Sequence, residues 1–132
     1  MILLAAAASL LAVKGGWATF RDGPVCRAVA EPVRRTTTPL KPFAALAVAP
    51  GRAPVLSFRL GHVPRDGRAM LTVGGKSVQL AIAGDMARTI DPQAIDALRA
   101  GQTMTVRTRA GYEIYDLRGA PTAIDAALAA CR

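Results

Sequence analysis

The sequence contains a single histidine, His62, so any Ser-His-Asp site or histidine-dependent metal site would have to use it. Hydrolases of the α/β type place the nucleophile in a G-x-S-x-G turn, and none of the candidate serines, Ser9, Ser57 and Ser77, lies in that motif. One histidine and two distant cysteines also lack the ligand spacing of a zinc site. His62 follows Gly61 at the end of a predicted strand, and we interpret it as a turn residue.

Gly75-Lys76-Ser77 resembles the end of a phosphate-binding loop. The full motif requires another glycine five positions before Gly75, and Met70 stands there instead. It also requires a helix to follow, whereas residues 78–82 have the pattern of a strand. The sequence therefore argues against a nucleotide-binding loop, and we expect no cofactor.

The carboxylates are few and show no obvious catalytic pairing. Asp85, Asp91 and Asp96 lie around a predicted short helix, and Glu113 and Asp116 lie on the last predicted strand. Two facing carboxylates can hydrolyse glycosidic bonds, but no spacing here marks such a pair. We predict a protein without enzymatic activity and keep an unrecognised hydrolase as an alternative.

The formal net charge of +8 favours anionic partners. Nucleic-acid sites interleave basic residues with aromatic ones, and aromatic residues make up only 5% of this chain, so we predict no nucleic-acid partner. Arg107 and Arg109 share one face of a predicted strand, and Lys76 or Arg68 on a neighbouring strand would complete a shallow basic patch facing anionic envelope components. A merely solvated basic surface is the alternative. The candidate anion-binding residues are Arg34, Arg35, Lys41, Lys76, Arg107 and Arg109.

The two cysteines lie near opposite ends of the chain. Cys26 belongs to the predicted strand VCRAVA, and Cys131 shares one helical face with Ile124 and Leu128. We predict a disulfide between Cys26 and Cys131, formed in an oxidising compartment, with two unpaired buried cysteines as the alternative. Closing a loop of roughly 100 residues would stabilise the fold by about 3–5 kcal/mol.

Residues 1–13, MILLAAAASLLAV, form an apolar run followed by Lys14-Gly15-Gly16. A membrane-spanning helix needs about 20 such residues, so we do not expect an integral membrane protein. The run is typical of the apolar region of a signal peptide, although no basic residue precedes it and no clean cleavage site follows. We therefore predict a signal-peptide-like segment over 1–13, a single β-rich domain over 14–132, and a periplasmic or secreted location. A buried N-terminal helix is the alternative.

Most of the remaining chain alternates apolar and polar residues with the period of a β-strand. Gly74-Gly75 is typical of a two-residue hairpin, and Asp91-Pro92 has the residues that begin a helix. Residues 31–42 and 84–90 show no period. These patterns predict a mainly β fold with minor α, an antiparallel β-sandwich or small barrel with one short helix and a C-terminal helix. Strands are expected at residues 17–20, 25–30, 43–48, 55–60, 69–73, 77–82, 102–109 and 112–117, and helices at 91–101 and from Pro121 to Cys131.

Several of these features together resemble the invasion-associated locus B family. They are Trp17 followed by a turn and Cys26, the hairpin over residues 73–80, and the ending from Tyr115 through Gly119 to Cys131. The resemblance implies a small exported, β-rich protein of the periplasm or cell surface, as found in alphaproteobacteria, with no enzymatic activity or cofactor. We do not extend a role in invasion to this protein. From sequence, the expected function is an envelope-associated binding or structural domain, with an anion-binding module as the alternative.

Overall fold

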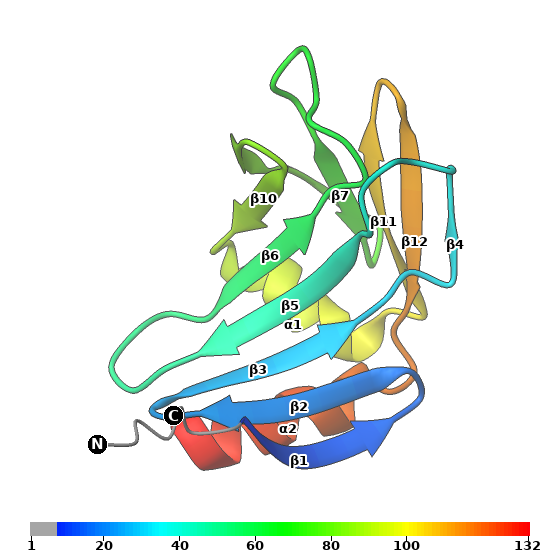
Figure 1. The fold of residues 1–132 in the computed structure, drawn as a ribbon. Coiled ribbons are helices and arrows are strands. Elements are labelled where there is room, and N and C mark those ends of the chain that lie inside the picture. Colours follow the sequence, from blue (N-terminus) through cyan, green and yellow to red (C-terminus); the bar gives the residue numbers. More distant parts are fainter. Residues whose placement is uncertain (1–7) are drawn as a thin grey trace.

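The computed structural model describes residues 8–132, which form two antiparallel β-sheets and two α-helices (Figure 1). This confirms the predicted mainly β fold. The first sheet ends in two edge strands, β1 and β9, each of which pairs with a neighbour on one side only. The described residues therefore form a sandwich-like arrangement and not a closed barrel. In spatial order the first sheet contains β1 (Ser9–Lys14), β2 (Trp17–Asp22), β3 (Val25–Ala30), β5 (Phe43–Val48), β6 (Val55–Arg59), β10 (Met86–Thr89) and β9 (Ala81–Ala83). The second contains β4 (Arg34–Arg35), β12 (Gly111–Asp116), β11 (Thr103–Thr108), β7 (Met70–Val73) and β8 (Lys76–Gln79).

The core lies between the two sheets and under the helices. Phe58 of the first sheet meets Tyr115 of the second with ring centroids 5.7 Å apart, and both side chains are buried. Trp17 is fully buried, and its indole N–H donates to the main-chain oxygen of Asp116 at 2.7 Å. This bond satisfies the only polar group of the indole and joins β2 to the end of β12.

Helix α1 (Pro92–Ala100) begins and ends where the sequence predicts. The Asp91 carboxylate accepts the main-chain N–H of Gln93 at 2.9 Å, and Pro92 occupies the first helical position, where its missing N–H costs nothing. Gly101 follows the last turn, and its N–H donates to the main-chain oxygen of Ala97. Neither α1 nor any other helix within residues 8–132 is long and apolar enough to cross a membrane.

Helix α2 (Ala120–Cys131) lies along β2 and β3 (Figure 1). The Thr19 hydroxyl of β2 donates to the main-chain oxygen of Ala123 at 2.7 Å. At the other end of the helix, Cys131 and Cys26 form the predicted disulfide, with their Cα atoms 5.7 Å apart. The alternative of two unpaired cysteines is therefore wrong.

Residues 9–13 of the predicted signal-peptide-like segment belong to strand β1. Residues Ser9–Lys14 pair with β2 at the edge of the first sheet, through a turn in which Gly15 and Gly16 both have positive φ. Leu10 and Val13 are more than half exposed, so this part of the run is neither helical nor buried, contrary to the alternative of a buried helix. Residues 1–7 lie outside the described part of the chain, and removal of residues 1–13 stays a prediction.

Three segments differ from the predicted strand pattern. The expected strand over 77–82 is split at Leu80, where the chain passes from β8 of the second sheet to β9 of the first. The supposedly irregular residues 84–90 contain β10, which pairs with β6 and β9, and the predicted loop over 31–42 contains the two-residue β4. Pairing with strands distant in sequence supplies the hydrogen bonds that no local period reveals.

The hairpin at Gly74-Gly75 is confirmed. Val73 of β7 pairs with Lys76 of β8, and the two glycines between them have φ values of +56° and +75°. Residues other than glycine rarely adopt two successive positive φ angles, which is why a Gly-Gly pair is a reliable local signal of a hairpin.

Candidate anion-binding site

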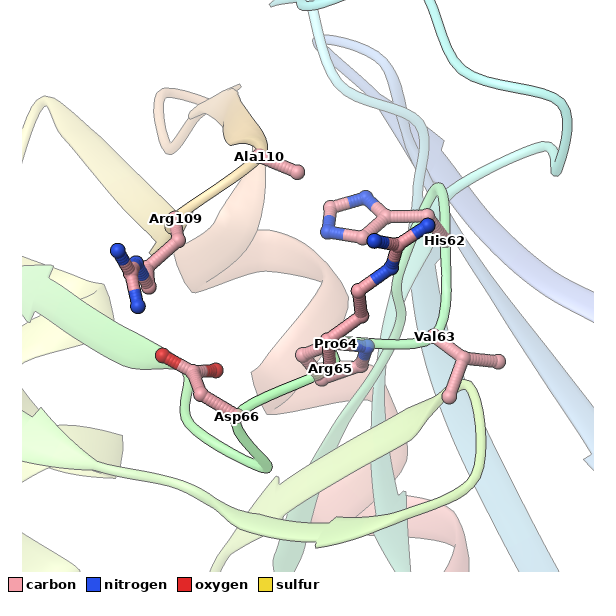
Figure 2. A pocket seen from close by; sticks show the side chains of 7 residues that line it. All are labelled: His62, Val63, Pro64, Arg65, Asp66, Arg109 and Ala110. Atoms are coloured by element: carbon pink, nitrogen blue, oxygen red, sulfur yellow. The ribbon is translucent and has the colours of Figure 1, made fainter.

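A hollow of about 760 Å³ opens between the loop that follows β6 and the turn that joins β11 to β12 (Figure 2). Arg65 of the loop and Arg109 of the turn both line it, together with Asp66 and His62. The complete lining is His62, Val63, Pro64, Arg65, Asp66, Arg109 and Ala110.

A second hollow of about 470 Å³ adjoins the first along β7, β8 and β11. Both hollows are lined by Asp66 and Arg109, so these two residues lie where the hollows adjoin. We call the two adjoining hollows, with the residues lining either of them, the arginine trough. The second hollow is lined by Asp66, Arg68, Ala69, Met70, Gln79, Arg107, Thr108 and Arg109.

The arginine trough has a large excess of positive charge. Four arginines line it, and Asp66 is its only carboxylate. Within residues 8–132, none of the four arginines forms an ion pair; the basic partners in the ion pairs present are Lys41, Arg59, Lys76, Arg99 and Arg118. The guanidiniums of Arg65, Arg68, Arg107 and Arg109 therefore keep most of their donors for a ligand.

Within the described residues, Asp66 forms no ion pair with these arginines. Its Oδ1 accepts the main-chain N–H of Arg68 at 3.1 Å and so shapes the loop before β7. Arg107 lies over the ring of Tyr112, with its guanidinium carbon 6.0 Å from the ring centre. That contact orients the guanidinium without removing its charge.

His62 is held in the wall of the trough by Thr108. The Nε2 of His62 lies 2.9 Å from the Thr108 hydroxyl, and the same hydroxyl accepts the main-chain N–H of Ala110 at 3.3 Å. The Nδ1 of His62 is buried and has no hydrogen-bond partner among the described residues. A hydroxyl–histidine pair used for nucleophilic catalysis has an acid on the other ring nitrogen, and this pair has none there. The bond joins the loop that follows β6 to β11.

Glu113 holds the main chain of Gly61, the residue before His62. Its side chain is only 5% exposed, and its Oε1 accepts the main-chain N–H of Gly61 at 3.0 Å. Burial raises the pKa of Glu113, an effect opposed by the hydrogen bond from Gly61 and by the nearby charges of His62 and Arg35. Gly61 also has to be glycine, because a Cβ there would lie 2.1 Å from the Thr38 hydroxyl oxygen.

This arrangement gives a prediction for Glu113. We expect Glu113→Ala to lower the free energy of unfolding by about 2 kcal/mol, because the buried Gly61 N–H loses its acceptor. Glu113→Gln keeps an acceptor oxygen and should lose much less. The folded wild-type protein binds the Glu113 proton more tightly than the unfolded chain does, so its stability falls as the pH rises from about 4.5 through the raised pKa. Glu113→Gln has no titrating carboxyl group at this position. Its free energy of unfolding should therefore rise relative to that of the wild type across this pH window.

Urea unfolding of the two variants and the wild type at several pH values measures both effects. Equal stability of the alanine and glutamine variants would show that the Gly61 hydrogen bond contributes nothing. A difference between wild type and Glu113→Gln that does not change with pH would contradict the raised pKa.

The structure brings together only some of the predicted anion-binding residues. Arg107 and Arg109 both line the trough, with Arg68 beside them as expected. Lys76 lies at the opposite end of the β7–β8 hairpin from the trough, where it forms an ion pair with Asp91 at 3.9 Å.

The basic residues of the 31–42 segment lie outside the trough. Lys41 pairs with Glu31 at 2.8 Å, and both side chains are largely exposed. Arg34 and Arg35 are exposed on β4, and an Nη1 hydrogen of Arg35 is donated to the Thr38 hydroxyl at 3.3 Å. These three cations are therefore separate from the cluster that includes Arg107 and Arg109.

Sequence reasoning missed Arg65 and Asp66 of the β6–β7 loop. The sequence patterns indicate only Arg68 from this loop as part of a basic patch, yet Arg65 and Asp66 also line the trough. Two arginines flanking Asp-Gly, beginning three residues after the only histidine, were the available signal. Their meaning depended on which distant loop lies opposite.

No family model matches this sequence, and the comparisons with curated proteins and with solved structures find no match either. Among residues 8–132, no group of three or more His, Cys, Asp or Glu side chains is arranged to hold a metal ion.

Proposed function

We propose that this chain is an exported, non-enzymatic envelope domain that binds an anionic ligand in the arginine trough. The observation that carries the proposal is the set of four arginines that, among residues 8–132, have no ion-pair partner and surround a single carboxylate. An anion bound in the trough would be attracted by the positive charges of the arginines that line it.

Guanidinium groups suit this task because each presents several N–H donors in a fixed planar fork. A carboxylate, sulfate or phosphate can accept two parallel bonds from one such fork, and charge-assisted bonds are stronger than neutral ones. The net charge of +8 adds long-range attraction that brings an anion to the surface before it docks.

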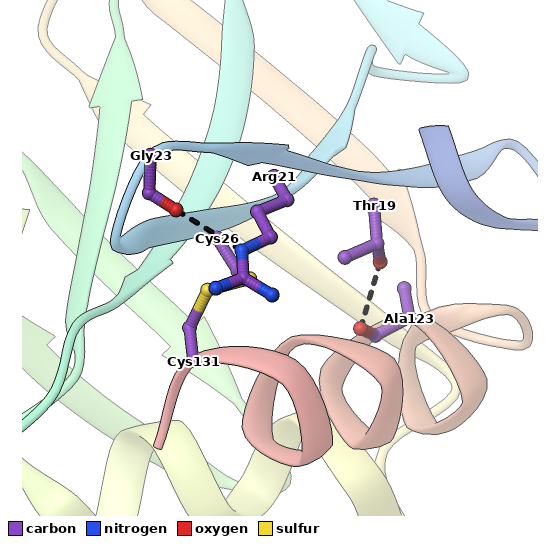
Figure 3. The surroundings of a disulfide bond; sticks show 6 residues. All are labelled: Thr19, Arg21, Gly23, Cys26, Ala123 and Cys131. Carbon is purple, nitrogen blue, oxygen red and sulfur yellow. Dashed lines mark hydrogen bonds between the residues drawn. A yellow bond between two sulfur atoms is a disulfide. The ribbon is translucent and has the colours of Figure 1, made fainter. Parts of the chain in front are cut away.

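The disulfide supports the exported part of the proposal. Figure 3 shows Cys131 on the last turn of α2 meeting Cys26 on β3, with the side chain of Arg21 beside the bridge. Bridges of this kind form and persist outside the reducing cytosol. The apolar segment over residues 1–13 and the resemblance to an exported family agree with that location.

The binding proposal predicts a site-specific loss of affinity. We expect Arg65→Gln/Arg109→Gln to weaken binding of dextran sulfate by roughly 10- to 100-fold, because two charge-assisted contacts are lost. The matched control is Arg27→Gln/Arg52→Gln, which removes the same charge from two exposed residues outside the trough. Titration by calorimetry at several salt concentrations, with uncharged dextran in parallel, measures the effect.

For the wild type we expect affinity for dextran sulfate to fall steeply as salt rises. The salt dependence of the trough variant should be shallower than that of the control variant. Equal losses in both double variants would mean that net charge alone attracts the polymer, and the proposed site would be rejected.

A further inference from the structure

The geometry points to an acidic polysaccharide as the ligand, lying along the arginine trough with its hydroxyl groups donating to Asp66. This inference rests on the proposed anion-binding function and specifies the class of anion. It follows from three properties of the trough: its length and openness, the position of Asp66, and the kind of apolar side chain beside the arginines.

The trough consists of two adjoining hollows at the surface. It extends from Ala110 at the β11–β12 turn, past Asp66 and Arg109, to Gln79 on the edge strand β8. Its four arginines are all exposed. An enclosed pocket would suit a single small anion, whereas an open row of cations suits a chain that carries several negative charges and continues beyond both ends.

Asp66 selects among such chains. Its carboxylate lines both hollows, at the junction of the two, and one of its oxygens is engaged by the Arg68 N–H. A carboxylate only accepts hydrogen bonds at neutral pH, so it repels a ligand that consists of phosphate groups alone. A uronic-acid chain carries both carboxylates for the arginines and hydroxyl donors for Asp66.

The apolar part of the lining agrees with a sugar chain. Val63 and Met70 line the trough with 57% and 41% of their surface exposed. Such side chains can cover the C–H faces of pyranose rings. No Phe, Tyr or Trp side chain is among the residues that line either hollow in the described structure, and nucleic-acid strands are usually held by stacking on aromatic rings.

The test compares Asp66→Asn with the wild type on two polyanions. Asparagine keeps an oxygen that accepts the Arg68 N–H, so the loop is preserved. We expect Asp66→Asn to bind oligogalacturonate roughly tenfold more weakly than the wild type, because a hydroxyl loses a charged acceptor. The same variant should bind inorganic polyphosphate as tightly as the wild type or more tightly, because a repulsive charge is removed. Asp96→Asn, on the exposed face of α1, makes the same change in net charge and should alter neither affinity.

Four outcomes are informative. Opposite responses of the two polyanions to Asp66→Asn support the inference. Tighter binding of both would show that Asp66 only repels anions, which overturns the polysaccharide assignment and leaves anion binding intact. Galacturonate monomer binding as tightly as the oligomer would overturn the extended mode. Absence of binding to every polyanion, dextran sulfate included, would instead reject the proposed function.

Discussion

We expect replacement of Cys26 and Cys131 by serine to lower the free energy of unfolding by about 4–5 kcal/mol. The bridge joins residues 105 positions apart, and opening such a long loop returns a large conformational entropy to the unfolded chain. Both residues are almost fully buried, at 0% and 2% exposure, so two serine hydroxyls would also enter the core. The loss is comparable with the total stability of many small domains.

Denaturant unfolding of the double variant, of each single variant and of the reduced wild type measures this effect. The single variants should lose nearly as much as the double variant, because either substitution breaks the bridge. A wild-type unfolding midpoint in the double variant would contradict the prediction.

The same cysteines report on the compartment. In protein isolated from the cell envelope, neither thiol should react with an alkylating reagent until the chain is denatured and reduced. Intact mass then also shows whether residues 1–13 have been removed. Free thiols in freshly isolated protein would reject the export proposal.

The second large effect is expected at Gly119. A Cβ at this position would lie 1.8 Å from the main-chain oxygen of Lys14 and 2.6 Å from its carbonyl carbon. Gly119 has a φ of −87°, which any residue adopts, so the whole penalty of Gly119→Ala is steric. We expect a loss of about 3 kcal/mol, because backbone has to move where β1 turns over the start of α2.

Gly16→Ala is the matched control in thermal or urea unfolding. A Cβ at Gly16 would meet no atom within 4 Å. Gly16→Ala should therefore lower the free energy of unfolding only by the cost of a positive φ of +82°, about 1–2 kcal/mol. A chain that lacks residues 1–15 has neither Lys14 nor Gly15, so Gly119→Ala should cost little there. A full penalty in that shortened chain would show that the clash with Lys14 is not its cause.

This comparison also bears on processing. If export removes residues 1–13, Lys14 becomes the first residue and is no longer held by the rest of β1, so it can move away from Gly119 and the edge of β2 becomes free. If β1 is retained, Gly119 stays sterically constrained. A mature protein whose mass shows that β1 has been removed should therefore be little destabilised by Gly119→Ala. A mature protein that keeps β1 should be strongly destabilised by the same substitution.

Local features of the sequence determined several parts of this fold. The Gly74-Gly75 hairpin, the Asp91 cap with Pro92, and the helical face ending at Cys131 each depend on residues a few positions apart. Turn geometry, capping and helical period act over such short distances, so they can be deduced without knowing the rest of the molecule. The Cys26–Cys131 bridge could be predicted because the chain offers only one possible pair.

The tertiary structure alone decided the candidate site. Arg65 and Arg109 are separated by more than 40 positions in the sequence, and they face one hollow because the β6–β7 loop lies opposite the β11–β12 turn. The same long-range pairing made residues 86–89 a strand and left Lys76 and Lys41 outside the basic cluster. Electrostatic repulsion and attraction depend on distances in space, and only the packing of the two sheets sets those distances for this chain.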